Sequence, residues 1–179
     1  MSYFSQYFDE LSEFFKNVDE SLLIKSAEMV QTIKKNKSKI IIAGNGGSAA
    51  IASHVAVDFT KAAKVRAINF NEADLITCFG NDYGYENWIK EALIAYSDPG
   101  DLLILVSSSG QSPNILNAAR ETKKLDLDLI TLSGFLETNP LKDLGRINFW
   151  IDSSNYNYVE MTHHIWLLAI CDYVISQNS

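Results

Sequence analysis

The chain of 179 residues has few of the features that mark secreted, membrane or nucleic-acid-binding proteins. Its two cysteines, Cys78 and Cys171, lie in apolar or amphipathic segments without C-x-x-C spacing, so we expect buried free thiols and a cytoplasmic setting. No window approaches the ~18 consecutive apolar residues of a membrane-spanning helix, and no basic segment precedes an apolar one at the N-terminus. A net charge of −7 argues against direct binding of nucleic acid, which relies on clustered Lys and Arg.

Length and composition favour one domain over residues 1–179, with an N-terminal helical layer over 1–36 and an α/β core over 37–179 that ends in a long helix. Apolar residues from 3 to 36 recur about every 3.6 positions, which predicts two amphipathic helices divided near residues 17–19. An aromatic stripe on the first helix would pack on the domain's own core or on a second subunit, and we favour the second subunit. The stripe consists of Tyr3, Phe4, Tyr7, Phe8, Phe14 and Phe15.

From residue 39 onward, short apolar segments alternate with helical patterns. Strands are expected at 39–43, 65–69, 101–106, 127–132 and 147–151, and helices at 48–62, 72–79, 86–96, 113–124 and 156–177. This order predicts an α/β protein with a three-layer α/β/α sandwich around a five-stranded parallel sheet. Ligands of such sheets bind beyond the carboxyl ends of the strands.

Two loops at expected strand ends have the composition of anion-binding sites. The first follows the apolar run Ile40–Ala43 and contains Asn45, Gly46, Gly47 and Ser48, with Ser48 expected to cap the next helix. The second contains four serines before Pro113, namely Ser107, Ser108, Ser109 and Ser112. Serine hydroxyls and helix N-terminal amides bind phosphate oxygens without Lys or Arg, whereas a single serine-rich turn often only caps its own helix. The pair of loops favours a phosphate site.

Nucleotide loops are the obvious rivals. Gly44, Gly46 and Ala49 fit the weak G-x-G-x-x-A pattern of dinucleotide-binding proteins, but the next expected strand ends at Asn69 without an acidic residue for a ribose. The chain has no G-x-x-x-x-G-K-[ST] sequence, which excludes a nucleoside triphosphate loop of that type.

Other polar residues could contact a ligand. Asp82 is expected in a loop over residues 80–87, where it is a turn residue or a ligand for a sugar hydroxyl. Tyr83, Tyr85 and Trp88 are interpreted as packing residues, because few basic residues alternate with them.

Two carboxylate and histidine pairs have i, i+4 spacing, which places each pair on one helix face. His54 and Asp58 form the first, and Glu160 and His164 form the second, with His163 as an alternative partner. Together they could bind a divalent metal or supply an acid and a base. Each histidine could equally form only a hydrogen bond with its neighbouring carboxylate.

Nearly the whole chain resembles the sugar isomerase (SIS) family, and most closely its phosphoheptose isomerase branch. The resemblance rests on His54, on E-x-x-H at 160–163 and on four further segments: AGNGGSAA at 43–50, GNDYG at 80–84, SSSGQSPN at 107–114 and LITLSG at 129–134. It implies a flavodoxin-like fold, a homotetramer with active sites between subunits, and isomerisation of sedoheptulose 7-phosphate to D-glycero-D-manno-heptose 7-phosphate for lipopolysaccharide or capsule.

The resemblance also implies roles for single residues. Asn45, Gly46, Gly47, Ser48 and Asp82 would contact the sugar, and the serines would hold its phosphate: Ser107, Ser108, Ser109 and Ser112. The family's usual H-x-x-x-E becomes His54 to Asp58, Glu160 replaces a usual Gln, and Leu168 stands where a catalytic His is usual.

We therefore predict a shifted site in which His54, Asp58, Glu160 and His164 bind zinc, with Asp58, Glu160 and His164 as the candidate catalytic residues. An isomerase of a phosphosugar is the leading interpretation, and a different sugar phosphate is one alternative. The missing His favours another, a SIS module without catalysis that acts as a phosphosugar sensor or as a tetrameric adaptor of the DnaA-binding type.

Overall fold

Five parallel strands form one sheet in the order β2-β1-β3-β4-β5 in the computed structural model, which describes residues 1–177. The strands are β1 (Ile40–Gly44), β2 (Ala67–Asn69), β3 (Leu102–Ser107), β4 (Asp128–Ser133) and β5 (Ile147–Trp150). The chain order reverses between β1 and β3, so a ligand-binding crevice is expected beyond the carboxyl ends of these two strands.

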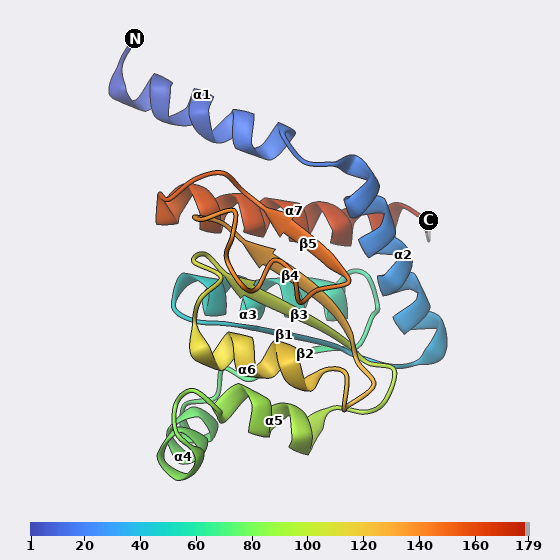
Figure 1. Cartoon of the computed structure of the whole chain (residues 1–179). Helices are drawn as coiled ribbons and strands as arrows, with labels where there is room; N and C mark the ends of the chain where they lie inside the picture. The colour runs from blue at the N-terminus through green and yellow to red at the C-terminus, as the bar shows by residue number, and fades with distance from the viewer. Residues whose placement is uncertain (178–179) are drawn as a thin grey trace.

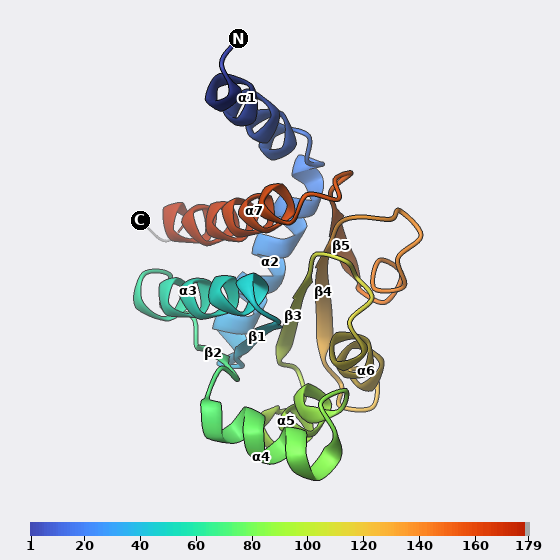
Figure 2. The same ribbon diagram turned by 90° about the vertical axis from the view of Figure 1, so that its left-hand side faces the viewer.

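Helices cover both faces of the sheet, as Figures 1 and 2 show. They are α1 (Tyr3–Lys16), α2 (Glu20–Asn36), α3 (Gly47–Lys61), α4 (Ala73–Tyr83), α5 (Trp88–Tyr96), α6 (Pro113–Glu121) and α7 (Tyr156–Ser176). One hydrophobic cluster joins the sheet to α2, α3 and α7, and a second joins its opposite face to α5 and α6. The predicted three-layer sandwich with a five-stranded parallel sheet is confirmed.

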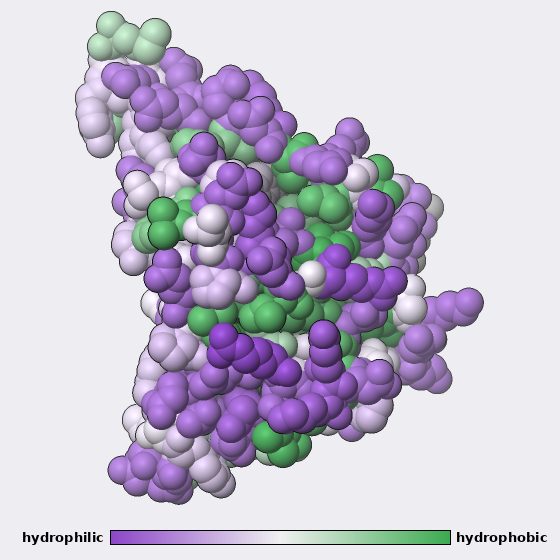
Figure 3. Space-filling model, viewed as in Figure 1, coloured by the Kyte–Doolittle hydropathy of each residue, from purple (hydrophilic) through white to green (hydrophobic). Residues whose placement is uncertain are grey.

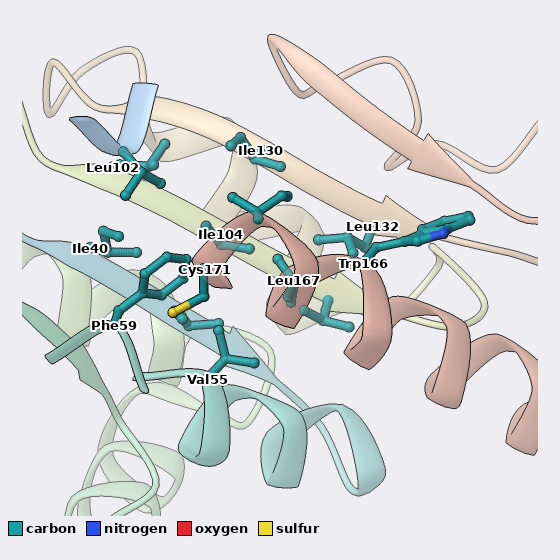
Figure 4. Close-up of a cluster of buried hydrophobic side chains, with 14 of the residues drawn as sticks. Ile40, Val55, Phe59, Leu102, Ile104, Ile130, Leu132, Trp166, Leu167 and Cys171 are labelled. Atoms are coloured by element: carbon teal, nitrogen blue, oxygen red, sulfur yellow. The ribbon is translucent and has the colours of Figure 1, made fainter. Parts of the chain in front are cut away.

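The central strands are apolar because both of their faces are covered. Every residue of β1 and of β3 is buried, so neither strand has a polar face. Figure 4 shows Val55 and Phe59 of α3 gathered with Leu167 and Cys171 of α7 in the cluster that packs on these strands. This packing fixes the starts of α3 and α7 relative to the sheet, and both starts border the site described below.

The helix α1 extends away from the rest of the chain (Figure 1) and has no buried residue. Its contacts run largely through Tyr158 of α7, whose ring lies 4.8 Å from that of Tyr7 and whose hydroxyl donates to Glu10 Oε2 at 3.0 Å. Tyr3, Phe4 and Phe8 are all more than 60% exposed. On the face in Figure 3, hydrophobic residues gather in a band across the middle.

Three details differ from the sequence-based expectations. Asp82 lies in the last turn of α4 and not in a loop, because α4 continues through Gly80 to Tyr83. Cys78 is exposed on the same helix, while Cys171 is buried, and both thiols are free. The expected packing role is confirmed for Trp88, which is 2% exposed, and is wrong for Tyr83 and Tyr85, which are 50% and 55% exposed. Within residues 1–177, no helix is long and apolar enough to span a membrane.

Candidate functional site

The two glycine- and serine-rich loops meet at the reversal of strand order. Their strands pair in register up to Gly44 of β1 and Val106 of β3, so both loops begin at the same edge of the sheet. They enclose a pocket of about 240 Å³. It is lined by Asn45, Gly46, Gly47, Ser48, Ser107, Ser108, Ser109, Ser112, Tyr156 and Glu160. The structure thus brings together both predicted loops and Glu160.

The first loop leads into the uncapped N-terminus of α3. Gly46 has φ of 54°, a conformation that glycine adopts without the steric cost of a Cβ. Gly46 is the N-cap of α3, and no side chain caps this end, so the expectation that Ser48 is the cap is wrong. Amides in the first turn of a helix lack intrahelical acceptors, and with the positive end of the helix dipole they attract anions.

The second loop provides hydroxyl groups and another uncapped helix start. Ser112 is the N-cap of α6 but its side chain makes no capping bond, and Pro113 occupies the first turn. Ser109 Oγ accepts a hydrogen bond from the Gln111 amide at 3.2 Å. Ser108 Oγ is buried and has no hydrogen-bond partner within residues 1–177. A buried hydroxyl of this kind is costly unless something binds it, so Ser108 is suited to a polar ligand.

Glu160 brings a carboxylate to this pocket. It lies on α7, and the Glu160 carboxylate packs against the α-carbon of Gly47, where any Cβ would overlap it. Burial raises the pKa of Glu160 above its ordinary value, because the charged form loses hydration. A carboxylate in such surroundings holds a proton more readily than a solvated one, which suits a group that accepts and returns protons.

His54, Asp58 and His164 form a second polar group beside the pocket. His164 Nε2 and His54 Nδ1 share a hydrogen bond of 2.9 Å, and His54 Nε2 lies 3.5 Å from Asp58 Oδ2. Burial lowers the pKa of His164, as does the neighbouring His54, while Asp58 raises it in part. None of the three lines the pocket. The structure therefore brings together three of the four residues of the predicted shifted site and places Glu160 in the loop pocket.

His163 points elsewhere. Its Nε2 lies 3.1 Å from the Ser133 carbonyl oxygen, which requires Nε2 to donate, and Nδ1 is buried without a hydrogen-bond partner within residues 1–177. Burial lowers the pKa of His163 to about 4. His163 is thus a neutral core residue, and His164 is the histidine of α7 that contacts His54.

The four predicted zinc ligands do not lie together as one group in this structure. No group of three or more His, Cys, Asp or Glu side chains within residues 1–177 is placed to hold a metal ion. The facing nitrogens of His54 and His164 are joined to each other by a hydrogen bond.

The residues in and beside the pocket are not all those that the sequence predicted as site residues. Asp82 is absent from the pocket lining, and its Oδ1 accepts a hydrogen bond from Asn81 Nδ2 at 2.8 Å. Tyr156, which the sequence analysis did not select, lines the pocket at the start of α7, with its ring 4.9 Å from that of Phe135. Asn114 was also missed, although it directly follows the serine-rich loop, and its amide contacts Asn45.

Comparison with known proteins places this geometry in a family. The SIS domain family profile matches residues 2–134. The phosphoheptose isomerase of Aliarcobacter butzleri is 30% identical over 177 residues, covering 96% of this chain and 93% of that protein. The structure of phosphoheptose isomerase GmhA from Neisseria gonorrhoeae superposes with a TM-score of 0.87 at 26% identity, covering 96% of each chain.

A protein solved with a bound sugar phosphate shares the fold at lower similarity. The Vibrio vulnificus NanR protein, solved in complex with ManNAc-6P, has a TM-score of 0.73 and 18% identity, covering 95% of this chain and 59% of that one. Similarity at this level concerns the fold alone. The profile match and the full-length relatives show that the chain belongs to the SIS domain family.

Proposed function

We propose that this protein is an isomerase that interconverts the ketose and aldose forms of a phosphosugar, with sedoheptulose 7-phosphate and D-glycero-D-manno-heptose 7-phosphate as the favoured pair. The proposal is supported by relatives named phosphoheptose isomerase that align along almost the whole chain. The observation that carries it is a single pocket in which two uncapped helix starts, a set of serine hydroxyls and one carboxylate converge. These groups match a substrate with a phosphate at one end and an acidic C–H at the other.

The phosphate end is assigned to the serine-rich loop. Ser107, Ser108, Ser109 and Ser112 supply hydroxyls, and the start of α6 supplies amides and a positive dipole end. The lining contains no Lys or Arg. Neutral donors of this kind bind phosphate without forming ion pairs with it, as suits a ligand that must also leave.

The reacting end is assigned to the side of the pocket that contains Glu160. Glu160 is the one carboxyl group among the lining residues, and its raised pKa favours reversible protonation. As a base it removes the proton from C1 of the ketose, and the electron pair forms an enediolate with C2. The proton held by Glu160 exchanges with solvent, and delivery of a proton from Glu160 to C2, with transfer of a hydroxyl proton from O1 to O2, yields the aldose. No atom is gained or lost.

The histidine pair and zinc are separate parts of the proposal. Asp58 and His164 are candidate proton carriers, and His54, Asp58, Glu160 and His164 are candidate zinc ligands, as the family resemblance suggests. His54 and His164 are hydrogen-bonded to each other and neither lines the pocket, so experiment must test these roles. Elemental analysis of protein purified without chelators tests for zinc, and His164→Ala tests for a catalytic role.

The biological setting is also part of the proposal. We expect a cytoplasmic homotetramer that supplies heptose for lipopolysaccharide or capsule. The aromatic residues of α1 support association with other copies, because Tyr3, Phe4 and Phe8 are each more than 60% exposed.

A second candidate function is binding without turnover. Leu168, partly buried against the core, stands where the resembled family has a histidine, and this observation favours a sensor or an adaptor. The same pocket would then bind a phosphosugar as a signal. Turnover separates the two functions.

The test is incubation with sedoheptulose 7-phosphate, with added zinc, without it and after chelation, followed by NMR of the aldose phosphate. We expect turnover. Binding of the sugar without turnover under all three conditions would contradict the isomerase proposal and favour the sensor. Loss of turnover after chelation, restored by zinc, would support the zinc proposal.

A further inference from the structure

A pair of asparagine side chains connects the two loops of the pocket. Asn114 Nδ2 donates to Asn45 Oδ1 at 2.8 Å, and Asn45 Nδ2 donates to Asn114 Oδ1 at 3.0 Å. Asn45 follows β1, while Asn114 lies in the first turn of α6, 69 positions later in the chain. Asn114 is 1% exposed and does not line the pocket, whereas Asn45 does.

A third side chain completes this contact. The hydroxyl of Tyr85, from the connection between α4 and α5, donates to Asn45 Oδ1 at 3.1 Å. Asn45 Oδ1 therefore accepts two hydrogen bonds, which uses both of its lone pairs. Asn45 Nδ2 has two hydrogens, of which one is bonded to Asn114. The one remaining polar group of the Asn45 side chain is an N–H.

We propose that Asn114 is a positioning residue that, together with Tyr85, turns the Asn45 amide so that its remaining N–H donates to an oxygen of the bound phosphosugar. This inference rests on the proposed function, since it concerns the same pocket. It makes Asn45 a donor only, so the oxygen that it contacts accepts a hydrogen bond. Suitable oxygens are the sugar carbonyl, the enediolate oxygen that it becomes, and a hydroxyl through its lone pair.

The burial of Asn114 helps to hold the two amide groups in one orientation. Hydrogen bonds shielded from water are electrostatically stronger, and an unpaired amide there is costly, so the two amides hold each other in one orientation. The hydrogen bonds of this pair join the two asparagines to each other and to Tyr85, and none involves a serine hydroxyl, so the groups proposed to bind phosphate depend less on the pair. Loss of Asn114 should therefore affect recognition of the sugar more than recognition of phosphate.

The test is a double-mutant cycle with Asn114→Ala, Asn45→Ala and the combined variant. The affinity of sedoheptulose 7-phosphate is measured by calorimetry, and that of inorganic phosphate in parallel. Asn114→Ala is expected to lower the affinity for the sugar phosphate about tenfold, which is the effect of one well-placed hydrogen bond. It should change the affinity for inorganic phosphate less than about threefold. In the Asn45→Ala background, Asn114→Ala should have no further effect on sugar affinity.

Asn71→Ala is the matched control. Asn71 Nδ2 donates to Ala49 O and to Ser53 Oγ, both at 2.7 Å, so this variant also loses two side-chain hydrogen bonds but does not border the pocket. It should lower the melting temperature as Asn114→Ala does and leave sugar affinity unchanged. Tyr85→Phe should weaken sugar affinity in the same direction as Asn114→Ala and leave phosphate affinity unchanged.

Three results would overturn the inference: equal weakening of sugar phosphate and phosphate by Asn114→Ala, multiplicative effects in the cycle, or no binding of the sugar phosphate to the unaltered protein. Conversion, followed by NMR on the same samples, tests the proposed function separately. If the sugar phosphate binds and Asn114→Ala has no further effect in the Asn45→Ala background, but no aldose forms, the positioning role is supported and the isomerase proposal is contradicted. If aldose forms but the effects of the two substitutions on affinity multiply, the isomerase proposal is supported and the positioning role is contradicted.

Discussion

At the scale of single residues, Glu160 combines two opposite effects. Its carboxylate disfavours a phosphate group in the same pocket, because like charges repel, yet it is the lining residue suited to accept a proton from carbon. The resembled family usually has Gln at this position. In the proposed function, Glu160 supplies a base in a chain where Leu168 stands at the position for which the resemblance implies a histidine.

Glu160→Gln separates these effects. We expect kcat to fall by about 100-fold or more, because general-base catalysis contributes at least that much. The affinity for inorganic phosphate should rise, because a negative charge leaves the pocket. Steady-state kinetics and phosphate titration measure the two changes. Glu137→Gln, at an exposed carboxylate paired with Lys142, is the control and should change neither. A kcat within about threefold of the unaltered protein would show that Glu160 is not the base.

His163 makes stability depend on pH. Its pKa is about 4 in the folded protein and near 6.5 when unfolded, so the unfolded state binds more protons between these values. The free energy of unfolding should fall as the pH drops from 6.5 to 4, by up to about 3 kcal/mol. His163→Gln keeps a donor for the Ser133 carbonyl but cannot titrate, so its curve should lack this component. His164 also has a lowered pKa, so it contributes a smaller loss of stability toward low pH, and that loss remains in the His163→Gln variant.

Urea denaturation across this pH range measures the difference. The gap between the two curves should narrow toward low pH, as the unaltered protein loses the stability that His163 provides in its neutral form. Parallel curves would mean that His163 has the same pKa in both states.

At the scale of elements, the start of α3 links the fold to the site. Gly44 and Gly47 both lack space for a side chain, but their neighbours differ. A Cβ on Gly44 would lie 2.7 Å from the Ser48 carbonyl carbon, which is backbone. A Cβ on Gly47 would overlap the end of the Glu160 side chain, which can rotate away. Gly44 is therefore required by the fold, and Gly47 leaves room for Glu160.

Paired alanine substitutions test this distinction. Gly47→Ala should change the free energy of unfolding by less than about 1 kcal/mol, because alanine favours the helix, while it displaces Glu160 and lowers kcat. Gly44→Ala should lower stability by about 1–3 kcal/mol through overpacking. Chemical denaturation and kinetics on both variants supply the comparison. Equal destabilisation by both, or full activity of Gly47→Ala, would contradict this account.

The local sequence pattern was enough to predict the sheet, because β1 and β3 are continuously apolar and each is followed by a loop rich in glycine or serine. It also located the pocket, since the carboxyl ends of neighbouring parallel strands lie at one edge. It failed at Asp82, because Gly80 and Gly84 suggested a loop where α4 continues to Tyr83. Cys78 was assigned to the core from apolar neighbours, but the outer face of α4 exposes it.

Residues that meet only in three dimensions were harder to find. Tyr156 enters the pocket because α7 starts beside the loops, and Asn114 meets Asn45 across 69 positions of sequence. The i, i+4 spacing did identify His54 with Asp58, yet it could not show that His54 faces His164 while Glu160 lies beside Gly47. Side-chain directions across two packed helices depend on the packing itself.

At the scale of the whole molecule, α1 is the part that the single chain does not explain. It has no buried residue, and Tyr3, Phe4 and Phe8 are exposed, although aromatic side chains gain most from burial. If α1 packs on other copies, the combined variant Phe4→Glu and Phe8→Glu should reduce the molar mass measured by sedimentation from that of a tetramer. A variant that keeps the tetramer mass, or an unaltered protein that sediments as a monomer, would contradict this role.

Proton transfer on a phosphosugar through an enediolate, in the pocket between the two loops, is the proposal on which the isomerase function depends. The most direct measurement is NMR of sedoheptulose 7-phosphate incubated with the protein in deuterium oxide. We predict aldose phosphate carrying deuterium at C2, together with exchange at C1 of the ketose, and loss of both signals in Glu160→Gln. Unchanged sugar with no deuterium on carbon, in a protein that still binds it, would contradict the claim.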